Sequence, residues 1–246
     1  PRAARARMRS VPSTIVASTG FDAMSHALET LTDVSYARRA RAPRASQRPP
    51  SQGANPFSDM VACEALGLVG KYLVRAVNDD ADSEARAEMM YAATLAGIAF
   101  GNAGCHLPHG MSYAVSGLVR EYRAPHYPQS EPFVPHGMSV VLNAPSVYRF
   151  TASACPDRHL DAAQRLGADM RGATPADAGE VLAGQIIQFM RATKFPGGLA
   201  AIGFSERDVD ALVEGTWPQQ RVLKNAPRAV TRAELGELFR GAMAYW

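Results

Sequence analysis

The chain has 246 residues, of which 47% are hydrophobic and 20% are charged, and its formal net charge is +3. This composition supports one large or two small domains with a buried core, and it excludes whole-chain disorder and a coiled coil. The positive charge lies at one end: residues 1–50 hold nine arginines against Asp22, Glu29 and Asp33, and the remainder is net −3. We therefore expect no nucleic-acid-binding surface spread over the fold.

Cysteine content and hydropathy exclude two further classes. Cys63, Cys105 and Cys155 form no CxxC pair, so we expect a reducing compartment, without a disulfide framework or a thiolate zinc site. No run of about 18 uninterrupted apolar residues occurs, so no membrane span is expected. We expect a cytoplasmic location, and the arginine-rich, acid-free start before Asp22 keeps a mitochondrial one open.

Hydrophobic periodicity predicts an all-α fold of about eight helices. An apolar stripe at helical spacing over residues 21–31 indicates the first. After an irregular excursion over residues 36–55, rich in arginine and proline, a second helix begins at Ser58 or Asp59, and an alanine-rich third runs from Asp82 or Ser83 to Phe100. The other helices are expected near 138–149, 157–167, 176–192, 205–215 and 231–245, with caps at Asp157, Thr174, Ser205 and Thr231.

Three short motifs contain histidines that are candidate metal ligands. Asp22 and His26 are four residues apart, so on a helix they point to the same side. His109 follows a proline suited to a first helical turn, and His136 stands between a proline and a glycine. One Asp and three His form a donor set suited to Fe²⁺ or Zn²⁺. Spacing alone leaves open a surface Asp–His hydrogen bond and a merely packed His109.

Three longer segments resemble the iron-containing alcohol dehydrogenase family. They are GFDAMSHALE (20–29), AGIAFGNAGCHLPHGMSYAVSGLV (96–119) and FVPHGMSVVL (133–142). The resemblance covers nearly the whole chain after about residue 11, and its nearest branch is the hydroxyacid-oxoacid transhydrogenases. It implies that Asp22, His26, His109 and His136 bind Fe²⁺ or Zn²⁺. It also implies an all-α fold like the C-terminal, dehydroquinate synthase-like half of these enzymes.

The resemblance further implies how the chain is organised and what it does. Residues 1–19 look like a remnant of an inter-domain junction and residues 20–246 like the metal-binding domain, while no glycine-rich phosphate loop of the family's N-terminal nucleotide-binding domain occurs. The implied activity is metal-dependent, NAD-linked oxidoreduction of a small alcohol or hydroxy acid, with the metal as a Lewis acid. In the transhydrogenase branch, an acid such as 4-hydroxybutyrate gives hydride to the nicotinamide, which then reduces 2-oxoglutarate. NAD is expected only in the full-length enzyme, no residue here is assigned to it, and a homo-oligomer is left open.

Two further residues are candidate catalytic groups. Many family members have a second histidine four residues after His109, where this chain has Tyr113, as the transhydrogenase branch does. Tyr113 either contacts substrate and relays a proton or is a half-buried aromatic. His106, shared with that branch, either contacts substrate or lies behind the ligands. His126 is expected on the surface and His159 in a structural position.

Other interpretations of the sequence stay open. The arginines of residues 38–48 either bind the carboxylate of an acidic substrate or belong to a solvated loop. A metal-dependent hydrolase would need a free carboxylate base, for which Glu29 is the obvious candidate. An inactive helical fragment that binds metal, or that retains only the fold, is the third function considered.

Overall fold

A computed structural model describes residue 8 and residues 10–246. In this part of the chain there are eleven α-helices and six 3-10 helices but no β-strand, which confirms the predicted all-α class. The helices are α2 (Ser13–Thr32), α3 (Pro56–Asn78), α4 (Ser83–Ala103), α5 (Leu107–Gly117), α6 (His136–Val141), α7 (Ala144–Thr151), α8 (Pro156–Arg165), α9 (Ala178–Ala192), α10 (Val209–Thr216), α11 (Gln220–Leu223) and α12 (Arg232–Gly241). The 3-10 helices are η1 (Tyr36–Arg38), η2 (Ala45–Gln47), η3 (Ala152–Ala154), η4 (Pro175–Asp177), η5 (Leu199–Ile202) and η6 (Glu206–Asp208). Among the described residues, no helix combines the length and apolar character needed to cross a bilayer.

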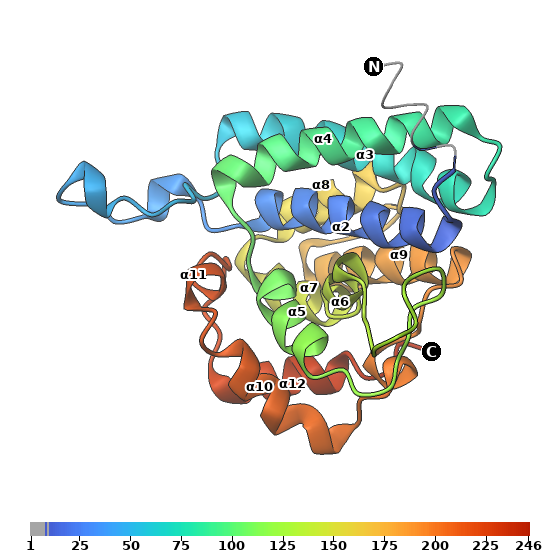
Figure 1. The fold of residues 1–246 in the computed structure, drawn as a ribbon. Coiled ribbons are helices and arrows are strands. Elements are labelled where there is room, and N and C mark those ends of the chain that lie inside the picture. Colours follow the sequence, from blue (N-terminus) through green and yellow to red (C-terminus); the bar gives the residue numbers. More distant parts are fainter. Residues whose placement is uncertain (1–7, 9) are drawn as a thin grey trace.

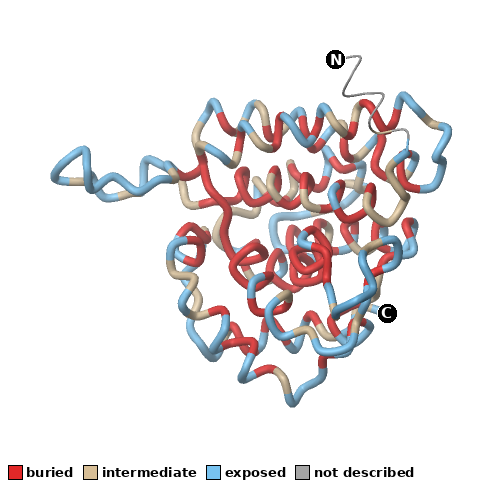
Figure 2. The backbone as a smooth tube through the Cα atoms, in the orientation of Figure 1, coloured by how far each residue is buried: buried red, intermediate tan, exposed pale blue. Residues whose placement is uncertain are grey.

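Helix α2 lies at the centre of the packing. It contacts α3 and α4 on one side and α6 and α8 on others, while α10 and α12 lie at the end of the molecule away from α4 (Figure 1). Its apolar stripe is fully covered, with Phe21, Met24, Leu28 and Leu31 at most 3% exposed. Buried residues run through the interior along the helices that face one another (Figure 2). The core thus forms around the helix that also carries the first candidate ligands.

The start of α2 bears on the expected domain boundary. The helix begins at Ser13 and continues without a break to Thr32, so the boundary expected between residues 19 and 20 falls inside it. Residues 1–7 and 9 of the expected junction lie outside the described residues. That residues 1–19 derive from such a junction stays a proposal.

Local capping explains where α3 and α4 begin. The Asn55 side chain accepts the Ser58 N–H at 3.1 Å, so α3 starts two residues before Ser58, with a proline in its first turn. The predicted cap at Ser58 or Asp59 is therefore wrong. The cap of α4 is confirmed, since Asp82 Oδ1 accepts the Ala85 N–H at 2.9 Å. Several alanines of α4 are 0% exposed and allow close approach of α2 and α3: Ala85, Ala92, Ala96 and Ala99.

Four other predicted elements differ in detail. The helix expected over 138–149 is two helices, α6 and α7, because Pro145 has no N–H to continue the hydrogen-bond ladder. Helix α8 begins at Pro156, so Asp157 is not its cap. Thr174 and Ser205 form capping boxes on 3-10 turns that precede α9 and α10, and Thr231 caps α12 as predicted. The four-residue α11 was not predicted, because it is too short to show a period.

Residues 36–50 leave the body as an irregular, largely exposed arm (Figures 1 and 2). The arm closes at its base, where the Tyr36 N–H donates to Ala54 O at 3.0 Å and the Ala54 N–H donates to Val34 O at 3.0 Å. Arg39 lies near this base and donates from Nη2 to Asn225 Oδ1 at 2.8 Å. The irregular excursion predicted for residues 36–55 is confirmed.

His159 has the structural position expected for it, and it links stability to pH. It is fully buried, with Nδ1 2.9 Å from Cys155 O and Nε2 2.9 Å from Thr151 Oγ1. Burial lowers the pKa of His159 from 6.5 to about 4. The unfolded imidazole therefore takes up a proton first as the pH falls, so its contribution to stability is complete above pH 6.5 and is lost toward pH 4.

We predict that the His159→Gln variant is less stable than the wild type at pH 7, and that the difference in unfolding free energy narrows by about 2 kcal/mol at pH 5. Urea unfolding of both proteins at the two pH values measures this change. Gln164→Asn, at an exposed position on the same helix, is the control and should show no such narrowing. A pH-independent difference for His159→Gln contradicts the prediction.

Candidate metal centre

The structure brings the four predicted ligands together from three helices. Asp22 and His26 extend from α2, His109 from the first turn of α5 and His136 from the start of α6. Asp22 Oδ1 lies 3.5 Å from both His109 Nε2 and His136 Nε2, and Asp22 Oδ2 lies 3.9 Å from His26 Nδ1. The ligand atoms of Asp22, His109 and His136 all lie within 4.8 Å of one another. This spacing is compatible with a common centre.

Two atoms of this cluster indicate that a divalent ion fits it. Asp22 Oδ1 and His109 Nε2 are buried, and neither has a hydrogen-bond partner. Buried polar atoms are rarely left unpartnered, because the loss of hydration costs free energy. A carboxylate oxygen and an imidazole nitrogen directed at one point are donors suited to Fe²⁺ or Zn²⁺. The donor set thus agrees with the predicted one, and metal binding itself stays a prediction.

Glu29 holds His109 from behind. Its carboxylate is 0% exposed and accepts two hydrogen bonds, from His109 Nδ1–H at 2.5 Å and from the backbone N–H of His106 at 2.6 Å. A proton held on Nδ1 would leave Nε2 of His109 to offer its lone pair to an ion bound beside Asp22. A carboxylate on the far nitrogen of a ligating histidine fixes its tautomer and raises its basicity. Glu29 is therefore a positioning residue, and it is not the free base that a hydrolase would need.

Charge and burial shape the ionisation of the cluster. Burial lowers the pKa of His26 to about 4, with the charge of His109 acting in the same direction. Burial opposes ionisation of Asp22, but His109, whose Nε2 lies 3.5 Å from Asp22 Oδ1, and the charges of His26 and His136 lower its pKa. His109 and Glu29 stabilise each other's charged forms against burial, so the pKa of His109 rises and that of Glu29 falls. At neutral pH, Asp22 and Glu29 are therefore carboxylates.

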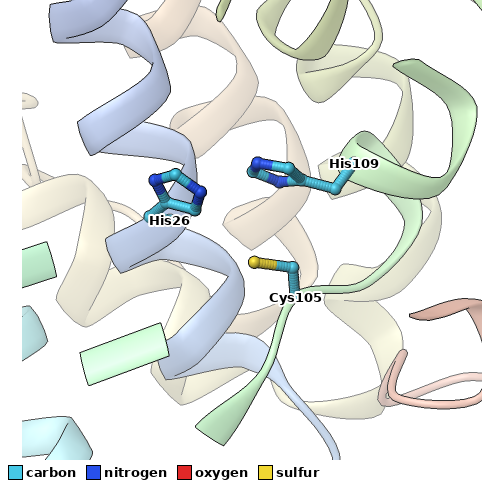
Figure 3. Close-up of side chains that lie close together, drawn as sticks. All are labelled: His26, Cys105 and His109. Atoms are coloured by element: carbon cyan, nitrogen blue, oxygen red, sulfur yellow. The ribbon is translucent and has the colours of Figure 1, made fainter. Parts of the chain in front are cut away.

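Cys105 is a neighbour that the sequence did not assign to the site. Its Sγ groups with nitrogens of His26 and His109 in a second, overlapping set of candidate ligands (Figure 3). Burial raises the pKa of the Cys105 thiol to about 11, so without an ion the sulfur is protonated. The ring of His26 is held between those of Phe100 and His109, with its centroid 4.0 Å from that of Phe100 and 4.5 Å from that of His109.

The close approach of α6 to α2 depends on Gly137. A Cβ built at this position would overlap the carbonyl oxygen of Ser18 and lie 2.9 Å from Asp22 Cβ. Only glycine allows α6 to lie near enough for the preceding residue, His136, to reach Asp22. The glycine that follows the histidine in the sequence motif is thus a packing requirement of the site.

A pocket of about 440 Å³ opens beside the cluster. Its wall includes His26, His109 and His136, the last with 51% of its side chain exposed, together with Tyr113. Tyr113 is 39% exposed, and its hydroxyl oxygen accepts a hydrogen bond from Arg221 Nη2 at 2.9 Å. Tyr113 is thus accessible to a small molecule beside the candidate ligands.

His106 does not line this pocket. Its side chain is 0% exposed, and Nε2 lies 2.9 Å from the hydroxyl oxygen of Thr32, which itself donates to Leu28 O. Burial lowers the pKa of His106 to about 4. The structure therefore gives His106 a position behind the ligands rather than a substrate contact. His126 is exposed, as predicted, with Nδ1 2.9 Å from Thr14 Oγ1.

Two residues of the pocket wall, Arg221 and Asn225, were missed from the sequence. Asn225 donates to Cys105 O at 2.8 Å and accepts from Arg39, so it ties the wall to the entry of α5. Arg221 lies in the four-residue α11 and Asn225 just after it, where the sequence has no periodic signal, and their partners lie more than a hundred residues away. Glu29 had a usable signal, because it follows His26 by three residues on the same face of α2.

Comparison with known proteins identifies the class. Residues 50–243 match the model of the Fe-containing alcohol dehydrogenase family, C-terminal. Among solved structures, 1,3-propanediol oxidoreductase superposes with a TM-score of 0.78 at 27% identity, over 96% of this chain and 53% of that one. The iron-containing alcohol dehydrogenase from Thermococcus thioreducens superposes with a TM-score of 0.71 at 27% identity, over 95% of this chain and 52% of that one. The chain belongs to the Fe-containing alcohol dehydrogenase family and corresponds to its C-terminal part.

Within the family, the similarity is high to one group of enzymes. The mitochondrial hydroxyacid-oxoacid transhydrogenase of Rattus norvegicus is 50% identical over 234 residues, which are 95% of this chain and 50% of the relative. The Homo sapiens enzyme of the same name is 49% identical over the same shares. The chain therefore spans about half the length of the curated relatives that it matches.

We predict that Gly137→Ala destabilises the fold by about 1 to 3 kcal/mol, the usual cost of overpacking, and weakens metal binding because α6 must move away from α2. Thermal unfolding and metal titration measure the two effects. Gly97→Ala is the matched control, since a Cβ there meets nothing within 4 Å, and it should be neutral or stabilising. Equal behaviour of the two variants contradicts the close-packing role.

We predict that Glu29→Gln raises the Kd for Zn²⁺ or Fe²⁺ by about 10- to 100-fold, because His109 loses its carboxylate partner. Competition with a chromophoric chelator measures the affinity, and circular dichroism verifies that the variant is folded. Glu64→Gln, at an exposed position on α3, should leave the affinity unchanged. A folded Glu29→Gln protein with wild-type affinity contradicts the orienting role of Glu29.

Proposed function

We propose that this chain is the metal-binding half of an NAD-linked oxidoreductase that interconverts hydroxy acids and oxo acids. One observation carries the proposal: the four residues Asp22, His26, His109 and His136 meet beside a pocket, with two buried atoms that have no hydrogen-bond partner and that a bound ion would satisfy. The relatives of known name, at about 50% identity, are hydroxyacid-oxoacid transhydrogenases. Both substrate classes in that name carry a carboxylate.

The residues of the site support this chemistry in separate ways. Asp22, His26, His109 and His136 would hold Fe²⁺ or Zn²⁺, which when bound supplies Lewis-acid polarisation of the substrate oxygen. Glu29 keeps the proton on Nδ1 of His109. Tyr113 Oη accepts from Arg221, which leaves the phenolic hydrogen free to be donated to a substrate oxygen in the pocket. This chain's residues thus orient the substrate and hold protons beside the reacting carbon.

The nucleotide would be placed by a partner domain. We propose that the N-terminal half of the full-length enzyme binds NAD and meets the pocket, because the matched family model describes a C-terminal part and the chain spans about half the length of the named relatives. The relatives are named as mitochondrial. That observation favours a mitochondrial location for this protein over the cytoplasmic one expected from composition.

The two other functions lose support from the site. A hydrolase would need a free carboxylate base, but Glu29 is buried against His109 and His106. None of the described residues that line the pocket is acidic. A fragment that retains only the fold has no reason to keep Asp22 Oδ1 and His109 Nε2 buried and unpartnered.

We predict that the purified chain binds one divalent ion but does not turn over NAD. Fused to the N-terminal half of the rat relative, it should transfer hydride from a hydroxy acid to an oxo acid. His136→Ala should lower that rate by about 100-fold or more, on the scale of losing stabilisation at a reacting oxygen. Metal analysis and coupled assays measure both properties, and the exposed His126→Ala variant is the control.

Three outcomes would contradict this proposal in different ways. Turnover of NAD by the chain alone, at rates typical of dehydrogenases, rules out the division of labour between two halves. Ester hydrolysis that tracks the metal content favours the hydrolase. If the metal content does not change when His109 or His136 is replaced, these residues do not bind the metal, and the chain is a helical fragment that retains only the fold.

A further inference from the structure

The pocket beside the metal centre has a wall with an uncompensated positive charge. Its described lining residues include three histidines and one arginine, Arg221, but no aspartate or glutamate. No acidic side chain of the described part of the chain forms an ion pair with Arg221, whose partner is the neutral hydroxyl of Tyr113. A guanidinium keeps its charge at all physiological pH values and presents a planar fork of donors. The wall is therefore suited to an anionic ligand.

The position of Arg221 is fixed relative to the candidate ligands. Tyr113 follows His109 by four residues on α5, so the two side chains lie about 6 Å apart at Cβ on one face of the helix. The hydrogen bond from Arg221 to Tyr113 thus holds the guanidinium about one helical turn along α5 from a ligand of the metal. A short acid spans such a distance.

Packing around α11 holds this part of the wall in place. Gly110 of α5 allows contact with α11, since a Cβ there would lie 2.6 Å from Leu223 Cδ2. Asn225, just after α11, donates to Cys105 O at 2.8 Å, and its own carbonyl oxygen accepts the Val34 N–H at 2.7 Å. The helix that carries Arg221 is therefore attached to both α5 and the end of α2.

We propose that Arg221 binds the carboxylate of the substrate and thereby selects hydroxy acids over uncharged alcohols. This inference rests on the proposed function, because it assumes that the substrate's hydroxyl or carbonyl end lies at the metal centre. The fork of Arg221 then donates to the carboxylate at the other end of the molecule. Arg221 is a specificity-determining residue, and Tyr113 is its positioning partner.

The arginines of the arm are not part of this subsite. Arg39 is engaged with Asn225 Oδ1, and none of the arginines over residues 38–48 lines the pocket. Only Pro50 and Ser51, at the return of the arm, reach it. Of the two interpretations of these arginines that the sequence left open, the geometry supports a solvated position for all except Arg39, since Arg38, Arg41, Arg44 and Arg48 are exposed.

A pair of ligands that differ only in charge tests the proposal. The Zn²⁺-loaded chain of 246 residues is titrated with 4-hydroxybutyrate and with 1,4-butanediol, in which a CH₂OH group replaces the carboxylate, and binding is followed by nuclear magnetic resonance. Arg221→Gln should weaken binding of the acid by about 10-fold and leave the affinity for the diol unchanged. The loss is modest because Arg221 is exposed. The affinity of Arg221→Lys for the acid should lie between those of the wild type and Arg221→Gln.

A second cation on the same segment provides the matched control. Lys224 is exposed and does not line the pocket, so Lys224→Gln should change the affinity for the acid by less than about 2-fold. Raising the salt concentration should weaken acid binding to the wild type more than to Arg221→Gln. Equal weakening by the two variants would show a general charge effect and overturn the assignment of Arg221.

Two further outcomes overturn the proposal: no saturable binding of the acid to the loaded chain, or an unchanged preference for acid over diol in Arg221→Gln.

The fused enzyme separates this inference from the proposed function. If Arg221→Gln raises KM for the acid with little change in kcat, both stand. If the fused enzyme is inactive while Arg221→Gln still removes the preference in binding, the proposed function fails and the carboxylate subsite remains.

Discussion

The buried hydrogen bonds of Glu29 are the interaction on which the rest of the site depends. A carboxylate without solvent contact costs several kcal/mol unless its oxygens are paired, as an order of magnitude. Here one oxygen accepts from His109 and the other from the backbone of His106. The two bonds join the last turn of α2 to the entry of α5, so the same contact that offsets the burial of Glu29 also orients a candidate ligand. Loss of the pair would disturb fold and site together.

Helix α2 serves two purposes because its residues divide between faces. Its apolar residues, Phe21, Met24 and Leu28 among them, are covered by the surrounding helices. Asp22, His26 and Glu29 follow one another at spacings of four and three, so they form a single polar stripe on another face. The stripe meets α5 and α6 only because those helices begin nearby with residues that allow close contact. The site is thus assembled at helix ends around one continuous helix.

The sequence was informative where a signal was local, and it failed where a contact was remote. Helical periodicity predicted the all-α class, and the histidine motifs, through their resemblance to the family, predicted which candidate ligands would converge, whereas their spacing alone left that open. The sequence suggests Glu29 only as the free base that a hydrolase would need, because its burial depends on the approach of α5, which no spacing within α2 reports. Arg221 and Tyr113 are 108 residues apart in the chain, so their contact exists only after α5, α10 and α11 have packed. Pro145 divided a predicted helix through its missing N–H.

Asn225 joins the arm and the pocket into one structural unit. Asn225 is 4% exposed, and its side chain contacts Arg39 at the base of the arm and Cys105 before α5. A buried amide satisfied on both of its polar atoms permits little displacement, since a shift would leave a donor or acceptor without a partner. The arm is therefore anchored by a polar contact at the rim of the pocket, although most of its length is exposed. A change in the base of the arm would therefore act first on Asn225, and through it on the wall that carries Arg221 and on the entry of α5, which holds the candidate ligand His109.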